Sequence, residues 1–90
     1  MNSHLRPTLA PHVRLQNDRA TGEPVLLSPE CIVTLNPTSH AIVLRCDGTK
    51  SLEEIALELA LEYEAPVELL RQDVTDFLAE LQSQNLILLS

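Results

Sequence analysis

Glycine, aromatic residues and cysteine are all scarce in this sequence, which has two glycines, one phenylalanine, one tyrosine, no tryptophan and two cysteines. Two glycines are too few for a glycine-rich loop that cradles a nucleotide phosphate. Cys31 and Cys46 do not form a CxxC motif, and His4, His12 and His40 have no metal-ligand spacing among themselves. We therefore expect no bound metal, no cofactor and no catalysis by the isolated chain.

Long hydrophobic runs are also missing. The N-terminal segment MNSHLRPTLAP lacks the apolar stretch of a signal peptide, and the terminal NLILLS is far too short to span a bilayer. We expect a cytoplasmic protein, with Cys31 and Cys46 as small buried apolar side chains in a reducing compartment.

A cysteine nucleophile is the one catalytic arrangement that the residue types allow, with Cys46 as the nucleophile and His40 as its base. The two residues are six positions apart in a predicted helix, which puts them on different sides of it. Helix packing for Cys46 and a polar position in the first turn for His40 explain the pair better.

Positive charge is scarce in the second half of the chain. Residues 1–50 carry five basic and four acidic groups, whereas residues 51–90 carry Arg71 against nine acids, so the net charge is +1 − 8 = −7. The acids fall at helix-surface spacing, which is typical of a solvated face. A chain of this charge repels phosphate, which argues against nucleic acid as a partner.

Three short segments of alternating or β-branched residues predict an antiparallel meander: Val13 to Gln16, Val25 to Ser28 and Cys31 to Leu35. Ser28, Pro29 and Glu30 leave room only for a tight turn between the last two. If the strands follow in order, the third lies at an edge, where its main-chain groups are open. Residues 1–12 are expected to form a flexible tail, and residues 13–90 a single domain.

Helix signals follow the strands. Asn36 is placed to cap a helix that begins at Pro37, and Gly48 is expected to end it. Ser51 and Glu54 form a capping box for a second helix that reaches about Tyr63. Its predicted buried stripe has the i, i+3, i+4, i+7 spacing and comprises Leu52, Ile55, Ala56, Leu59, Ala60 and Tyr63.

Leu57 and Leu61 lie on the opposite side of that helix from its buried stripe. Either they pack on a neighbouring loop, strand or terminus, or they belong to a partner or dimer surface. A third helix is predicted from Pro66 to about Gln84, with Asn85 as a left-handed stop. Leu86 to Leu89 then forms a short strand or an extended tail.

These elements define an α+β fold: a small winged-helix-like domain in which a three-stranded antiparallel sheet is followed by a three-helix bundle. Several motifs together carry a resemblance to a known family. They are Pro7-Thr8-Leu9, Val13-Arg14-Leu15, Asp18, the run from Val25 to Glu30, Leu35-Asn36, Cys46-Asp47-Gly48, Glu54-Ile55, Asp73-Val74 and the run from Phe77 to Leu81. In this combination the chain resembles the PqqD family, pyrroloquinoline quinone (PQQ) biosynthesis protein D, over nearly its whole length after the tail.

The resemblance implies a peptide chaperone without enzymatic activity. Proteins of this family bind the ribosomally made precursor peptide PqqA and present it to the radical S-adenosylmethionine enzyme PqqE. The same module serves as a leader-peptide recognition element in other peptide-modifying systems, where the leader adds as a strand to the sheet edge and packs against the last helix. This chain lacks a CxxxCxxC motif, so the chemistry belongs to the partner.

The expected peptide-binding residues lie on the third strand and the third helix, where an open edge runs beside an apolar wall. They are Cys31, Ile32, Val33, Thr34 and Leu35 on the strand, and Leu70, Val74, Phe77 and Leu78 on the helix. For each helix residue, plain core packing is an equally good explanation. We expect micromolar or somewhat tighter binding.

Other functions stay open on the sequence alone. A winged-helix nucleic-acid-binding protein needs a basic recognition helix, but the third helix offers only Arg71 among acids. A purely structural adaptor would bind the enzyme and ignore the peptide. Arg14, Arg19 and Arg45 stand out from the acidic background as candidate contacts to the partner enzyme. A homodimer in the absence of cargo is a further possibility.

Overall fold

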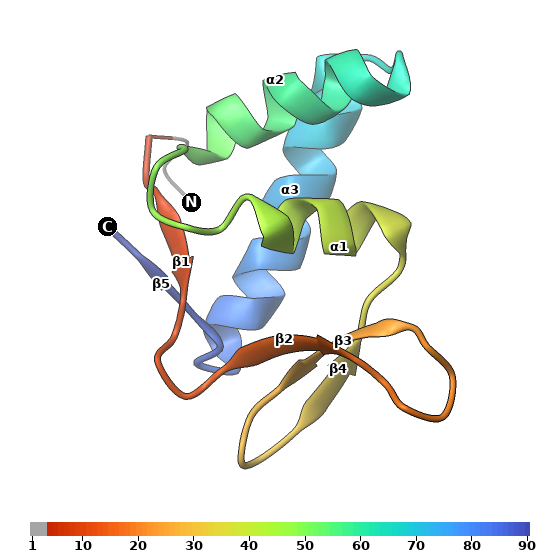
Figure 1. Ribbon diagram of the computed structural model, residues 1–90. Helices are drawn as coiled ribbons and strands as arrows, with labels where there is room; N and C mark the ends of the chain where they lie inside the picture. The colour runs from red at the N-terminus through yellow and green to blue at the C-terminus, as the bar shows by residue number, and fades with distance from the viewer. Residues whose placement is uncertain (1–3) are drawn as a thin grey trace.

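The structure, a computed structural model, describes residues 4–90 as two small antiparallel sheets and three helices (Figure 1). In chain order the elements are β1 (Pro7–Leu9), β2 (Arg14–Asn17), β3 (Pro24–Leu27), β4 (Ile32–Thr34), α1 (Pro37–Leu44), α2 (Leu52–Tyr63), α3 (Val67–Ser83) and β5 (Ile87–Leu89). The α+β class, the three-stranded sheet and the three helices predicted from the sequence are confirmed. None of these helices is long and apolar enough to cross a lipid bilayer.

The three-stranded sheet has the order β2-β3-β4, so β4 lies at an edge as predicted. Its register pairs Arg14 with Leu27 on one side of β3, and Leu26 with Val33 on the other. The predicted strands differ from the observed ones by about one residue at their ends, because hydrophobic alternation does not show where ladder pairing stops.

Helix α1 begins as the sequence predicts. Asn36 accepts a hydrogen bond from the Ser39 backbone N–H at 2.7 Å. The prediction that Gly48 ends this helix is wrong, because α1 stops at Leu44 with Arg45 as its C-cap. Gly48 has φ +84° and instead donates its N–H to the Pro7 carbonyl at 3.0 Å, so its left-handed conformation serves a turn beside β1.

Helix α2 carries the predicted capping box. Glu54 N–H donates to Ser51 Oγ at 3.2 Å, and Ser51 N–H donates to Glu54 Oε1 at 3.0 Å. The buried stripe is confirmed for Leu52, Ile55, Ala56 and Leu59, with Ala60 half-buried. The expectation for Tyr63 is wrong: this residue, the last of α2, is 41% exposed.

The end of α3 explains how the chain turns into β5. Asn85 takes φ +60°, as predicted, and its N–H donates to the Gln82 carbonyl at 3.0 Å. The N–H of Leu86 donates to the Leu81 carbonyl at 2.9 Å, which completes a Schellman motif. Leu86 is thereby buried, and the chain continues into β5.

Strand β1 is the main departure from the sequence prediction. Residues 1–12 were expected to form a flexible tail, yet β1 pairs antiparallel with β5 through Pro7–Leu89, Thr8–Leu88 and Leu9–Ile87. Ala10, just after β1, is also buried in the core. The tail prediction also covers residues 1–3, which lie outside the described residues. Two strands of three residues at opposite ends of a chain carry almost no local signal, so only tertiary pairing reveals them.

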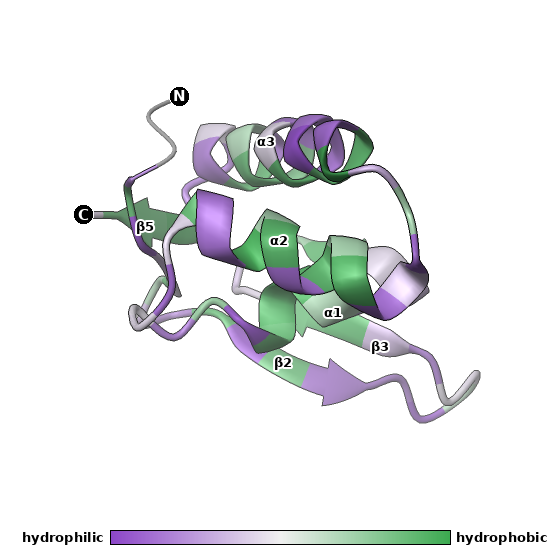
Figure 2. Cartoon of the chain, turned by 90° about the horizontal axis from the view of Figure 1, so that it is seen from above, coloured by the Kyte–Doolittle hydropathy of each residue, from purple (hydrophilic) through white to green (hydrophobic). Residues whose placement is uncertain are grey.

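The core lies between the helices and the three-stranded sheet. Helices α2 and α3 pack on each other, and Ile55, Leu59 and Leu78 are completely buried. Figure 2 shows the resulting pattern, in which apolar and polar residues alternate around the helices. Two residues separate the end of β4 from the start of α1, and α3 passes behind α1 in the view of Figure 1.

Candidate functional site: a groove beside an open strand edge

Strand β4 exposes main-chain groups at its outer edge. Antiparallel pairs alternate between bonded and non-bonded positions, and Leu35 N–H donates to the Pro24 carbonyl while Ser28 N–H donates to the Cys31 carbonyl. By this alternation Val33 bonds to β3, whereas Ile32 and Thr34 turn their N–H and C=O groups away from it. These two residues therefore offer four main-chain groups for pairing with another extended chain.

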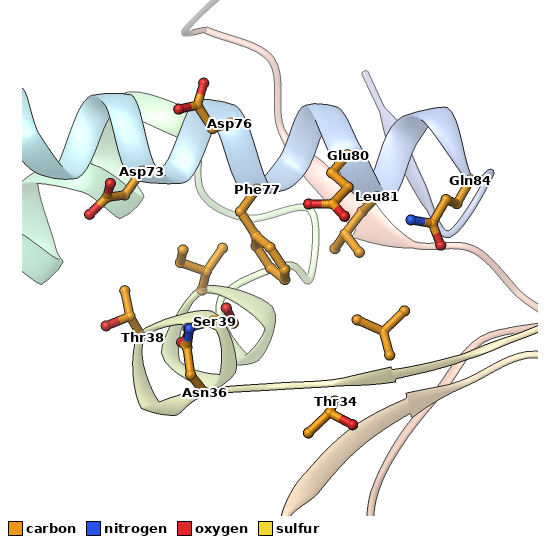
Figure 3. Close-up of a pocket in the computed structure, with 12 residues that line it drawn as sticks. Thr34, Asn36, Thr38, Ser39, Asp73, Asp76, Phe77, Glu80, Leu81 and Gln84 are labelled. Atoms are coloured by element: carbon orange, nitrogen blue, oxygen red, sulfur yellow. The ribbon is translucent and has the colours of Figure 1, made fainter.

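A groove of about 530 Å³ runs between α3 on one side and α1 with β4 on the other. Figure 3 shows the residues that line it. They are Val33, Thr34, Asn36, Thr38, Ser39, Ile42, Asp73, Asp76, Phe77, Glu80, Leu81 and Gln84. We call this set the β4–α3 groove.

The β4–α3 groove has an apolar floor and a polar rim. Val33, Ile42, Phe77 and Leu81 supply the floor, and Ile42 and Leu81 are each only 1% exposed. The other eight lining residues are all polar or acidic. An apolar floor with converging polar groups is the usual make-up of a binding site.

The α3 residues that line the groove form one continuous stripe at positions 73, 76, 77, 80, 81 and 84. At 1.5 Å per residue, this stripe is about 16 Å long. An extended chain of about five residues has the same length. The groove is therefore long enough for a short peptide strand laid against β4.

The predicted strand residues lie at or near this site. Ile32 is 66% exposed and Thr34 is exposed, whereas Cys31 and Val33 are half-buried. Leu35 is buried and packs in the core. The predicted strand residues thus lie on or beside the edge strand β4, and the outward main-chain groups belong to two of the five.

The four predicted helix residues divide between the groove and the core. Phe77 lines the β4–α3 groove, but Leu70, Val74 and Leu78 lie in the core, with at most 4% of each exposed. Apolar spacing points to the stripe that packs α3 onto the domain, whereas the groove is lined by the neighbouring stripe, in which polar and apolar residues are mixed. The spacing of Asp73, Asp76, Glu80 and Gln84 around Phe77 is the signal that could have revealed it.

The three arginines predicted to contact a partner enzyme differ in exposure and in their bonds within the chain. Arg14 and Arg19 are exposed. Arg45 Nε donates to Glu58 Oε1 and its Nη2 to Glu62 Oε2, both at 3.1 Å, while Nη1 donates to the Ala41 carbonyl. Arg45 therefore joins the end of α1 to α2 within the chain.

Within residues 4–90, the Cys46 thiol bonds to a backbone carbonyl rather than to His40. Burial raises the pKa of Cys46 to about 12, helped by the nearby Asp47 charge, and its thiol donates to the Ile42 carbonyl. His40 lines a separate hollow of about 570 Å³ on the β3 side of Thr34, together with Pro24 and Pro37. Among residues 4–90, no three His, Cys, Asp or Glu side chains gather as a metal site.

The fold and the site together define a small α+β domain with an open sheet edge beside a groove suited to an extended peptide. A family model described as coenzyme PQQ synthesis protein D (PqqD) matches residues 23–87, and the chain belongs to this family. The resemblance noted in the sequence is therefore confirmed.

Curated and solved relatives agree with this assignment. The chain is 41% identical over 84 residues to the "PqqA binding protein" of Xanthomonas euvesicatoria pv. vesicatoria (strain 85-10), which covers 93% of this chain and 91% of that protein. It matches the solution structure of the PqqD part of Methylobacterium extorquens PqqCD, a stand-alone recognition element, with a TM-score of 0.81, 28% identity and coverage of 98% and 93%. The crystal structure of PqqD from Xanthomonas campestris matches with a TM-score of 0.59, 38% identity and coverage of 96% and 97%.

Proposed function

We propose that this chain is a peptide chaperone of PQQ biosynthesis that binds the precursor peptide PqqA without modifying it. The names of its relatives support this, since they describe a PqqA binding protein and a recognition element for ribosomally made, modified peptides. The β4–α3 groove fits a peptide strand in length and in make-up. The chemistry would come from a partner enzyme.

The proposed mode of binding is strand addition to β4. The observation that carries it is the alternation along this strand, which turns the main-chain groups of Ile32 and Thr34 outward at an edge of the sheet. A peptide paired there would place every second side chain on the same face as Val33, over the floor formed with Phe77.

The expected affinity follows from favourable and unfavourable contributions to the free energy of binding. Four main-chain hydrogen bonds contribute roughly 1 kcal/mol each, and two apolar anchors on the groove floor roughly 1.5 to 3 kcal/mol each. Ordering the peptide costs on the order of 1 to 2 kcal/mol per residue, which cancels much of that gain. We expect micromolar or somewhat tighter binding, which allows the chaperone to release its cargo.

Release would occur to the radical S-adenosylmethionine enzyme PqqE, which we propose as the second partner. Arg14 and Arg19 are exposed candidates for this contact. Arg45 is a weaker candidate, because it would first have to leave Glu58 and Glu62. A homodimer through the β4 edge is proposed only for the chain without cargo, since the peptide would occupy the same edge.

A proline substitution tests the mode of binding. Ile32→Pro removes an outward N–H without touching the ladder to β3, and edge strands tolerate proline. Asn17→Pro, at the outer edge of β2, is the matched control. Calorimetric titration with PqqA should show roughly tenfold weaker binding for Ile32→Pro, from one lost bond and local strain, and wild-type binding for Asn17→Pro.

The same titration separates the alternatives. Equal affinity for both proline variants would contradict strand addition at β4. A structural adaptor would bind PqqE and show no heat with PqqA. A nucleic-acid-binding protein would shift a DNA duplex at low salt, which the acidic stripe of α3 and the pairing of Arg71 with Glu53 argue against.

A further inference from the structure

The β4–α3 groove carries negative charge on one wall and has no Lys or Arg in its lining. Asp73, Asp76 and Glu80 all lie on the groove stripe of α3. In Figure 3, Asp73 and Glu80 project on the side of α3 that faces α1 and β4, whereas Asp76 projects from the opposite side. Glu80 thus lies toward β4, and Asp73 lies above Thr38 at the start of α1.

The basic residues near the helices are engaged elsewhere. Arg45 and Lys50 pair with glutamates of α2, and Arg71 pairs with Glu53 and Glu68. Within residues 4–90, Asp73 and Glu80 have no ion-pair partner. Arg45, Lys50 and Arg71 thus pair with Glu53, Glu58, Glu62 and Glu68, whereas Asp73 and Glu80 are left to an outside charge.

We propose that the peptide held in the β4–α3 groove presents a lysine or arginine toward α3, where Asp73 or Glu80 receives it. This inference rests on the proposed function and adds a sequence requirement to it. The bound segment must carry a cation at a position that shares the face of Val33, because only alternate side chains of an added strand point to α3.

The two carboxylates are too far apart along α3 to receive the same side chain. Seven residues separate Asp73 from Glu80, which is about 10 Å along the helix axis. An extended chain covers that distance in about three residues. Glu80 lies toward the end of α3 that meets β4, where Gln84 Oε1 accepts from the Cys31 thiol at 3.8 Å, and Asp73 lies toward α1. A long cationic side chain on this face above β4 would meet Glu80, and one two or four positions along the peptide toward α1 would meet Asp73.

A plain solvated face is the competing explanation of the same acids. It predicts that removing their charge leaves peptide affinity unchanged, apart from a general effect of net charge. A matched pair of double variants separates the two explanations. Asp73→Asn with Glu80→Gln neutralises the groove. Glu64→Gln with Glu68→Gln makes the same change in net charge at the α2–α3 corner, where Arg71 keeps its hydrogen bonds to Glu53.

The experiment measures PqqA affinity by fluorescence anisotropy at low and high salt. Neutralising the groove should weaken binding roughly two- to fivefold at low salt, as expected for a partly exposed ion pair, with a smaller loss at high salt. The corner variant should bind as the wild type does. PqqA peptides in which each Lys or Arg is replaced in turn by Gln should identify the cation.

A charge exchange provides the specific readout. Glu80→Lys should weaken binding of PqqA, and a peptide with its identified cation changed to Glu should bind Glu80→Lys better than it binds wild type. If wild-type protein binds PqqA but the groove and corner variants bind equally, the inference is overturned and the proposed function stands. If the wild-type protein does not bind PqqA, both are overturned.

Discussion

Gly48 lies against Thr8 so closely that a Cβ atom on the glycine would be 2.8 Å from Thr8 Cγ2. The contact joins the turn after α1 to β1, where Thr8 also forms a bridge with Asp47. Both a left-handed backbone and a missing side chain are therefore needed at this position.

Gly48→Ala should destabilise the fold more than Gly22→Ala does. Both glycines have positive φ, +84° and +76°, but nothing lies within 4 Å of a Cβ at Gly22. Backbone strain alone should cost Gly22→Ala about 1 kcal/mol, and the Thr8 contact should raise the cost for Gly48→Ala to about 2 to 3 kcal/mol. Urea unfolding measures both losses of stability. Equal losses would show that β1 shifts away from the added methyl group without cost.

The capping box of α2 should make stability depend on acid. The hydrogen bond from Ser51 N–H holds the pKa of Glu54 below its ordinary 4.5, and the hydrogen bond from Arg71 lowers the pKa of Glu53. A carboxylate with a lowered pKa stabilises the fold above pH 4.5 and loses this effect as pH falls through its folded value. Free energies of unfolding at several pH values should therefore decline below pH 4.5. Glu54→Gln should show a shallower decline, and an identical decline would contradict this role.

The two cysteines should react at different rates. Burial raises the pKa of Cys46 to about 12 and leaves it 5% exposed, whereas Cys31 is half-buried beside Ser28. The thiolate is the reactive form, so native protein at pH 8 should be alkylated at Cys31 first. Mass spectrometry after timed iodoacetamide treatment follows both sites. Faster labelling of Cys46 would mean that the end of α1 opens readily.

Two leucines of α2 should differ sharply in their contribution to stability. Leu59 is fully buried, so Leu59→Ala should cost about 2 to 5 kcal/mol. Leu61 is 82% exposed, so Leu61→Ala should change the free energy of unfolding by less than about 0.5 kcal/mol. A large loss for Leu61→Ala would show that it packs on a neighbouring segment. A small loss leaves the partner surface as the explanation to pursue for Leu61 and the partly exposed Leu57.

Much of the fold could be predicted because its signals are local. Asn36, Ser51 and Asn85 each fix a helix end through their own side chain or backbone, and the stripe of α2 follows from helical spacing. The ends of the chain could not be predicted, because β1 and β5 form only through pairing between residues about 80 positions apart in sequence. Gly48 does adopt the left-handed conformation expected of it, but it bonds to β1 and does not end α1.

The candidate site was predicted only in part for a similar reason. Alternation along residues 31–35 located the open edge, and the family resemblance pointed to α3 as the opposite wall. Apolar spacing then favoured Leu70, Val74 and Leu78, which serve the core. A groove lined by acids around one phenylalanine has no apolar periodicity, so only the packing of α3 against α1 shows which helix stripe faces the strand.

The most direct test of the account is an amide chemical-shift titration of labelled protein with unlabelled PqqA, followed by hydrogen exchange on the complex. We predict large shifts at Ile32 and Thr34, shifts along the groove stripe of α3, and strong new exchange protection of the N–H groups of Ile32 and Thr34. Binding that shifts other surfaces and leaves these two N–H groups exchanging as before would contradict strand addition at β4.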